Sequence, residues 1–450
     1  MSHIKPCAIA NCETGDVSCD SYHLWSEDIR IMQEIGVNTY RFSISWPRLF
    51  YNGTPGQIDY NGYMYYSNLI DGLLAVNITP MVTLYHWDLP QYLQDEGGWM
   101  NERIQDWFYY YADFCFYAFG DRVKLWQTFN EPESFIINGY NGFFSPVVPN
   151  CPDCPYVANK NLLLAHANAY HVYDKVYRTK QQGQVGVVIG IEDARPKDNQ
   201  SESIMAASRQ MDWLAGVYLE PLLGSGNWPQ SMIDIVANRS AMMNYTESRL
   251  PRLSIAEQQH IQGTLDMFGV NIYTASLTGY ADSALEPKYY NDIMAYTYKD
   301  PRWPSSDSDW LKLVPSAVTN VLNYLSNNYN SQIPLYITES GWSNAPDAPL
   351  EDGPRIRFYN DYIRMALGAY QNGINIKGFI AWALMDNFEW RAGYEQRFGL
   401  YYVNFSDDAR PRIPKKSSEF YANVIKNNGF PPNQTTTTTS PMSTTTVTGK

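Results

Sequence analysis

Seven short apolar runs recur along this chain of 450 residues, and the sequence between them has helical spacing. A run that stays apolar, without a polar residue at every second position, is typical of a strand buried on both faces, as in a parallel sheet. We therefore predict buried strands at Thr39–Trp46, Thr79–His86, Lys124–Asn130, Gln184–Ile191, Asp266–Tyr273, Pro334–Glu339 and Ile376–Met385.

The segments between these runs predict helices. In Asn68–Asn77 four leucine and isoleucine residues fall on one helical face, and longer patterns span Arg103–Gly120, Asn161–Lys180 and Arg355–Asn372. Strands that alternate with helices indicate an α/β fold, and the chain length suits a TIM (β/α)8 barrel. A doubly wound open sheet is the alternative, although no glycine-rich phosphate loop follows the first strand.

The start of the chain differs from a complete barrel. A predicted helix at Trp25–Ile35 precedes the first strand, so the pattern has seven strands where a barrel needs eight. We expect the first β-strand to be missing, as in an incomplete gene model or splice form, with residues 1–19 a remnant of the first βα connection and 20–430 the barrel. The backbone of the two outer strands would then be buried without partners. The Thr/Ser/Pro-rich segment 431–450 predicts a disordered tail.

Charge and hydropathy exclude some classes of partner. The chain has 33 Lys and Arg against 46 Asp and Glu, a net charge of −13, which disfavours a nucleic-acid partner. No run of 18 or more apolar residues is present, so we expect no membrane-spanning helix.

The six cysteines leave more than one interpretation open. Cys151-Pro-Asp-Cys154 is either a short disulfide loop or a redox or zinc pair, but no second pair or histidine cluster is near, so we expect no metal. Cys7 and Cys12 could form another short disulfide loop. Apolar surroundings predict buried thiols at Cys19 and Cys115.

Glycosylation sequons indicate the secretory route, although no signal peptide is visible at Met1. We therefore expect a secreted glycoprotein, with Asn77 too buried for modification. The sequons begin at Asn52, Asn77, Asn199, Asn238, Asn244, Asn404 and Asn433.

Polar and aromatic residues gather at the carboxyl ends of the predicted strands, where a barrel of this kind places its catalytic groups. Two glutamates, Glu131 and Glu339, end apolar strands, and a carboxylate there is costly unless it is paired or used. Glycoside cleavage needs two carboxyl groups on either side of the scissile bond. Other strand ends supply His86, Trp87, Asn130, Asn271, Tyr273, Trp382, Glu389 and Trp390.

Many segments resemble the motifs of glycoside hydrolase family 1, the β-glucosidase family of (β/α)8 barrels, particularly its insect members. The two signature segments are TFNEP at Thr128–Pro132 and ITESG at Ile337–Gly341. The others, in order, are Thr14–His23, Tyr40–Arg48, Tyr85–Leu93, Gly97–Trp99, Phe119–Trp126, Trp382–Trp390 and Arg397–Val403. The resemblance implies a retaining exo-β-glycosidase that acts on small-molecule β-glycosides or oligosaccharides without a cofactor.

The resemblance also implies a role for each matching residue. Glu131 would be the general acid/base and Glu339 the nucleophile that forms a covalent glycosyl intermediate. Tyr273 would orient Glu339, and Arg41 would keep it ionised. Trp382 would form the platform under the sugar, and Glu389 and Trp390 would hold its 4- and 6-hydroxyls. The other substrate-binding residues would be His86, Trp87, Asn130, Asn271 and Phe398.

Two departures from the family pattern leave alternatives open. Ser340 stands where the family usually has Asn, and we expect little loss from it. The family's first strand, with a Gln that grips the 3- and 4-hydroxyls, has no counterpart here. An inactive, klotho-like binding protein is therefore the alternative function.

A 6-phospho-β-glycosidase is less well supported, because no basic Ser-x-x-x-Lys arrangement follows Trp390. Glu131 is not Gln, so the chain does not resemble the plant thioglucosidases, although another kind of thioglucosidase stays open.

Overall fold

A computed structural model describes residues 7–148, 151–282, 284–329 and 332–430 of the chain. The predicted tail, 431–450, and the sequon at Asn433 lie outside these residues.

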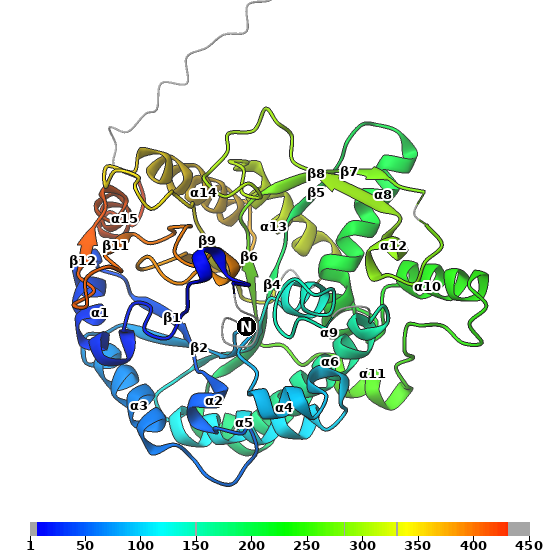
Figure 1. Ribbon diagram of the computed structural model, residues 1–450, viewed down its shortest axis with the longest axis horizontal. Helices are drawn as coiled ribbons and strands as arrows, with labels where there is room; N and C mark the ends of the chain where they lie inside the picture. The colour runs from blue at the N-terminus through cyan, green and yellow to red at the C-terminus, as the bar shows by residue number, and fades with distance from the viewer. Residues whose placement is uncertain (1–6, 149–150, 283, 330–331, 431–450) are drawn as a thin grey trace, which may run out of the picture.

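A parallel sheet of seven strands forms the centre of the molecule, and helices surround it (Figure 1). The strands follow the order β1-β2-β3-β4-β6-β9-β10, and every pair in it is parallel. All seven predicted strands are confirmed, and the sheet is the nearly closed barrel that the sequence predicts. Their bounds are β1 Thr39–Ser43, β2 Thr79–Tyr85, β3 Leu125–Asn130, β4 Gln184–Gly190, β6 Met267–Asn271, β9 Leu335–Ser340 and β10 Ile376–Ala381.

The inner and outer strands of this sheet differ in burial. Nearly all residues of β2, β3, β4, β6 and β9 are buried, whereas β1 and β10 are only half-buried. Within the described residues no ladder of backbone hydrogen bonds joins β1 to β10. The expectation that these outer strands are buried without partners is therefore wrong as to their burial, because most of their residues are only half-buried.

Helices cover the outer face of the sheet, and their apolar residues pack on it as the periodicity predicts (Figure 1). The predicted helix at Asn161–Lys180 is interrupted, because α6 ends at Val172 and the π-helical turn Tyr173–Tyr177 separates it from α7. The larger helices are α1 Ser21–Ile35, α3 Tyr60–Ala75, α5 Ile104–Phe119, α6 Cys154–Val172, α8 Ser201–Met211, α10 Gln230–Met242, α13 Ser316–Asn328, α14 Gly353–Gln371 and α15 Lys416–Lys426. The shorter ones are α2 Trp46–Leu49, α4 Gln91–Asp95, α7 Arg178–Gln181, α9 Val217–Leu223, α11 Ile255–Ile261 and α12 Tyr289–Ile293.

Two small sheets lie in the connections of the barrel. The first joins β5 (Asp193–Pro196), β7 (Ala275–Tyr280) and β8 (Ala295–Tyr298), in a region where the sequence carries no recognisable strand pattern. The second is the hairpin of β11 (Tyr401–Val403) and β12 (Arg412–Pro414). Neither sheet was predicted.

The hairpin and α15 lie beside α1, so elements from the first and last parts of the chain pack against each other (Figure 1). Arg412 Nε donates to Asp28 Oδ1 at 2.9 Å, and both side chains are buried. Tyr401 donates its hydroxyl to Glu34 at 3.3 Å. These contacts connect α1 to the hairpin of β11 and β12 through side chains.

The cysteines form two short disulfide loops, Cys7–Cys12 and Cys151–Cys154, which resolves the alternatives that their spacing leaves open. Cys19 and Cys115 are free and buried, as predicted. Across the described ranges, no group of three or more His, Cys, Asp or Glu side chains is arranged to hold a metal ion. Within those same ranges no helix has the length and apolar content needed to cross a bilayer.

Most of the sequon asparagines are accessible. Asn77 is exposed, so the expectation that it is buried is wrong: it follows α3 in the turn that leads into β2. Asn404 is half-buried, and the remaining sequon asparagines of the described chain, Asn52, Asn199, Asn238 and Asn244, are exposed.

Candidate active site

Glu339 lies at the carboxyl end of β9 and is 5% exposed. Arg41 on β1 donates to Oε1 at 2.6 Å, and the Tyr273 hydroxyl donates to Oε2 at 3.0 Å. A buried carboxylate needs such partners, because desolvation otherwise disfavours its charged form. The two contacts are those expected of an ionised group whose direction is fixed.

Glu131 follows the last residue of β3 and has a left-handed backbone, with φ of 47°. Its carboxyl accepts a hydrogen bond from Asn271 Nδ2 at 2.7 Å. Burial, followed by the negative charge of Glu339, raises the pKa of Glu131 to about 7. The two carboxyl groups therefore have unequal surroundings, because Glu339 contacts a guanidinium and a phenol, whereas Glu131 contacts an amide.

Asn130 joins the surroundings of the two carboxyl groups. Its Oδ1 accepts from Arg41 Nη2 at 2.6 Å and from Asn271 Nδ2 at 3.3 Å. Arg41 also binds Glu339 and Asn271 also binds Glu131, so one chain of hydrogen bonds runs from one carboxyl group to the other. Such a network holds both groups in fixed positions relative to each other.

Aromatic rings line the same end of the barrel. The ring of His86 lies 6.0 Å from that of Trp382 and 5.8 Å from that of Trp390, and Trp390 stacks on Trp87 at 4.2 Å. Burial and the nearby Arg41 lower the pKa of His86 to about 3, so its ring is neutral. It accepts a hydrogen bond from Asn130 Nδ2 through Nε2, at 3.1 Å. Flat rings beside neutral polar groups suit the apolar faces and hydroxyls of a sugar.

Glu389 is a third carboxyl group in this region. Burial, then the charges of Glu339 and Glu131, raise its pKa to about 8, and Trp382 forms a hydrogen bond to it. Trp87 and Trp390 have positive φ values of 80° and 48°, as Glu131 does. Left-handed conformations of bulky residues are strained and persist where surrounding contacts hold them, typically at functional sites.

Two further predicted positions lie slightly apart from these groups. Phe398 is 2% exposed and packs behind Tyr273 and Trp310, so the structure places it in the wall rather than on the surface of the site. Ser340 is buried, and its hydroxyl donates to the carbonyl oxygen of Ile272 at 2.7 Å.

Two residues of this region, Trp310 and Glu133, are not among the predicted site residues. Trp310 is 43% exposed and meets the ring of Tyr273 edge-on at 5.5 Å, which presents a flat face at the mouth of the site. Its loop carries no motif, so no signal pointed to it. Glu133 is buried two residues after Glu131 and accepts from Gly190 N at 2.7 Å. Burial and the charge of Glu131 raise its pKa well above the ordinary value. A second acidic residue directly after the TFNEP segment was a signal that could have identified it.

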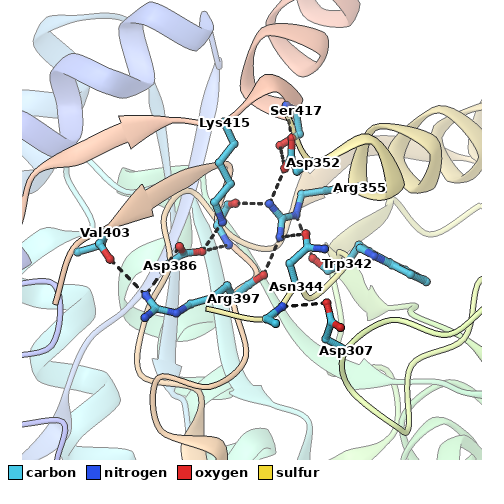
Figure 2. A network of polar contacts seen from close by, with 12 residues as sticks. Asp307, Trp342, Asn344, Asp352, Arg355, Asp386, Arg397, Val403, Lys415 and Ser417 are labelled. Atoms are coloured by element: carbon cyan, nitrogen blue, oxygen red, sulfur yellow. Dashed lines mark hydrogen bonds and ion pairs between the residues drawn. The ribbon is translucent and has the colours of Figure 1, made fainter. Parts of the chain in front are cut away.

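A buried ionic network supports the loops that follow β9 and β10 (Figure 2). Arg355 on α14 is fully buried and donates to the carbonyl oxygens of Trp342, Arg397 and Gly399, at 3.0, 2.6 and 2.8 Å. It also pairs with Asp352 at 2.6 Å. One guanidinium thus fixes both loops to the same helix, because its donors form a rigid planar fork.

Asp386 and Lys415 extend this network toward α15 (Figure 2). Lys415 Nζ donates to Asp386 Oδ1 at 2.7 Å, and Gly399 N donates to the same oxygen at 2.9 Å. Burial, then the positive charge of Arg355, lower the pKa of Lys415 to about 8. Asp386 belongs to the loop that leads to Glu389 and Trp390, so the network restrains the base of that loop.

Comparisons with known proteins agree with this geometry. The chain is 42% identical over 435 residues to lactase/phlorizin hydrolase of Homo sapiens, which covers 96% of this chain but only 22% of that protein. It is 40% identical over 422 residues to cytosolic beta-glucosidase of Homo sapiens, which covers 93% of this chain and 89% of that protein. Among solved structures, aphid myrosinase superposes with a TM-score of 0.89 at 34% identity, covering 94% of this chain and 91% of the other.

The family model for glycosyl hydrolase family 1 matches residues 2–430. A match of this length, together with relatives at 40% identity or more, shows that the chain belongs to glycosyl hydrolase family 1.

Proposed function

We propose that this protein hydrolyses terminal β-D-glycosides, with Glu131 as general acid/base and Glu339 as nucleophile. The observation that carries the proposal is the unequal environment of the two carboxyl groups. Glu339 has a cation and a phenol as partners, whereas Glu131 has an amide and a pKa raised to about 7. Membership of the family and the likeness to cytosolic beta-glucosidase support the same substrate class.

The reaction proceeds in two displacements. Glu339 attacks the anomeric carbon while Glu131 gives its proton to the departing glycosidic oxygen, so an ester bond forms as the C–O bond breaks. Glu131, now ionised, takes a proton from water, and the resulting hydroxide equivalent displaces Glu339. Two inversions leave the product with the configuration of the substrate.

The test is hydrolysis of 4-nitrophenyl β-D-glucoside by the purified chain, with the product anomer followed by NMR. We expect the β-anomer of glucose to form first. Glu339→Gln should lower kcat by at least about 10³-fold, because an amide cannot attack. Formation of the α-anomer first, or unchanged activity in Glu339→Gln, would refute the assignment. Binding of glucose without any hydrolysis would favour the inactive, klotho-like alternative.

The match to aphid myrosinase supports a second substrate class, the sulfur-linked glucosides, as a narrower candidate. Glu131 is compatible with either class, because it can act as the base in the second displacement. Parallel assays with 4-nitrophenyl β-D-glucoside and the matching 1-thio-β-D-glucoside separate them. A higher kcat/KM for the thioglucoside would select the second candidate.

We also propose that the protein is a secreted glycoprotein. Exposure of the sequon asparagines at residues 52, 77, 199, 238 and 244 supports this, since glycan transfer needs accessible acceptors. Peptide mass mapping of the native protein, before and after removal of N-glycans, tests the proposal. The absence of any glycan-dependent mass shift would contradict it.

A further inference from the structure

The first described segment of the chain lies across a turn that belongs to the candidate site. This turn, residues 388–395, includes Glu389 and Trp390 and is far from the segment in sequence. Glu13 accepts a hydrogen bond from Tyr394 N at 2.7 Å. The Tyr394 hydroxyl donates to the carbonyl oxygen of Thr14 at 2.9 Å, and Asn11 Nδ2 donates to Glu395 at 2.6 Å.

Packing adds to these hydrogen bonds. Ile9 is 6% exposed and lies against Gly393. A Cβ added at Gly393 would lie 3.3 Å from Cγ2 of Ile9 and 2.1 Å from the carboxylate of Glu13. A Cβ added at Gly15 would lie 3.1 Å from the ring of Phe388, so these two residues are also in close contact. Both ends of the 388–395 turn are therefore in close contact with the segment at residues 9–15.

The geometry of the turn links Gly393 to Glu389. Glu389 N donates to the carbonyl oxygen of Gly393 at 2.7 Å, and Gly393 N donates to that of Trp390 at 3.2 Å. Trp390 and Gly393 both have positive φ, 48° and 57°. Glycine adopts such a conformation without strain, whereas the conformation of Trp390 must be held by its surroundings. A shift at residues 393–394 is thus transmitted directly to Glu389.

We propose that Glu13 is a positioning residue for the 388–395 turn, and that its carboxylate sets where Glu389 and Trp390 meet the sugar. The inference rests on the proposed function, because it assumes that Glu389 binds sugar hydroxyls. Glu13 accepts the Tyr394 amide proton at the point where the turn returns from the site. Without that acceptor the amide loses its protein partner, and the turn can rotate away from the position that Trp390 and Glu389 need.

The test compares Glu13→Ala with the matched variant Glu13→Gln, whose amide oxygen can still accept the Tyr394 proton. For 4-nitrophenyl β-D-glucoside we expect Glu13→Ala to raise KM roughly tenfold, as expected for loss of one charge-assisted hydrogen bond, with kcat changed less than threefold. Glu13→Gln should stay within about threefold of the original KM. The Glu27→Gln variant, on the outer face of α1, serves as the control for removing a carboxylate elsewhere.

A merely structural role would lower Tm without changing which hydroxyls the enzyme recognises. The discriminating readout is therefore the ratio of kcat/KM for the glucoside to that for its 6-deoxy analogue. We expect this ratio to fall several-fold in Glu13→Ala and to recover in Glu13→Gln. An unchanged KM and an unchanged ratio in Glu13→Ala would overturn the proposal, as would a loss of kcat that Glu13→Gln does not restore.

Two measurements keep this test separate from that of the proposed function. If the original chain does not hydrolyse the glucoside, the proposed function fails, and the Kd for glucose is compared between the original chain and Glu13→Ala instead. Hydrogen exchange of the peptide that contains Tyr394 needs no sugar. We expect faster exchange in Glu13→Ala than in Glu13→Gln, and equal exchange in both would overturn the positioning role whatever the activity.

Discussion

The inner strands of the barrel and its two outer strands hold their positions by different means. β2, β3, β4, β6 and β9 pair on both sides and are buried, whereas β1 and β10 pair on one side among the described strands and are half-buried. Both kinds of strand nevertheless contribute to the site, since Arg41 is on β1 and Trp382 directly follows β10.

Side chains take the place of backbone pairing at the opening between the outer strands. Arg41 reaches from β1 to Glu339 on β9, and His86, after β2, faces Trp382. On the outside, Arg412 and Asp28 connect the hairpin to α1. Strand pairing therefore fixes the inner part of the site, while a few buried contacts fix the outer part. Four predictions test that difference.

The largest expected effect is on Arg41, which spans the opening. Arg41→Met would leave the buried carboxylate of Glu339 without its cation, an uncompensated charge that costs about 3–5 kcal/mol. We expect kcat/KM for an aryl β-glucoside to fall by roughly 10²- to 10³-fold. Steady-state kinetics measure this effect, and Arg41→Lys should recover part of it. A change of less than threefold in Arg41→Met would show that the ion pair does not hold the nucleophile.

Next comes the buried pair on the outside of the opening. Arg412→Met leaves Asp28 buried and unpaired, so the free energy of unfolding should decrease by about 3 kcal/mol. Urea unfolding followed by fluorescence measures it. The control, Arg30→Met, removes two exposed ion pairs on the same helix, with Glu27 and Glu34, and should change stability little. Equal effects of the two substitutions would mean that the outer contact does not secure α1.

One isoleucine on an inner strand and one on an outer strand allow the contribution of each kind of strand to stability to be compared. Ile337 on β9 is fully buried, and Ile376 on β10 is only half-buried. Ile337→Ala should reduce the free energy of unfolding by about 3 kcal/mol through lost burial and a residual cavity. Ile376→Ala should reduce it by about 1 kcal/mol, because the side chain of Ile376 buries less apolar surface on folding than that of Ile337 does. Equal losses would contradict the difference between inner and outer strands.

The smallest expected effect concerns pH. Glu131 must be protonated to act as an acid, and its pKa is raised to about 7, so kcat/KM should fall as the pH rises through about 7. The hydrogen bond from Asn271 lowers this pKa, so Asn271→Ala should move the falling limb to higher pH, by up to about one unit. A pH–rate profile of each variant measures the shift. A limb that moves to lower pH would contradict the role given to Asn271.

Much of the fold and of the site could be predicted, because both depend on local patterns. Every predicted strand of the barrel is present, since apolar runs without alternation suit strands that are buried on both faces of a parallel sheet. Glu131, Glu339, Arg41, Tyr273 and Asn130 meet at one end of the barrel, because parallel strands bring their carboxyl ends to the same edge. The small sheet of β5, β7 and β8 could not be predicted, because short strands in loops owe their pairing to distant partners.

Local patterns along the chain specify the order of strands and helices, the two carboxyl groups at strand ends, and the polar and aromatic residues around them. Other features depend on folding. Only the folded chain shows which carboxyl group contacts a cation and which has a raised pKa. Only the folded chain brings Arg41 to Glu339, His86 to Trp382 and Glu13 to Tyr394. The physical reason is that spacing along the chain specifies periodicity and burial, whereas the charge state of a buried group depends on neighbours that only folding brings within hydrogen-bond distance.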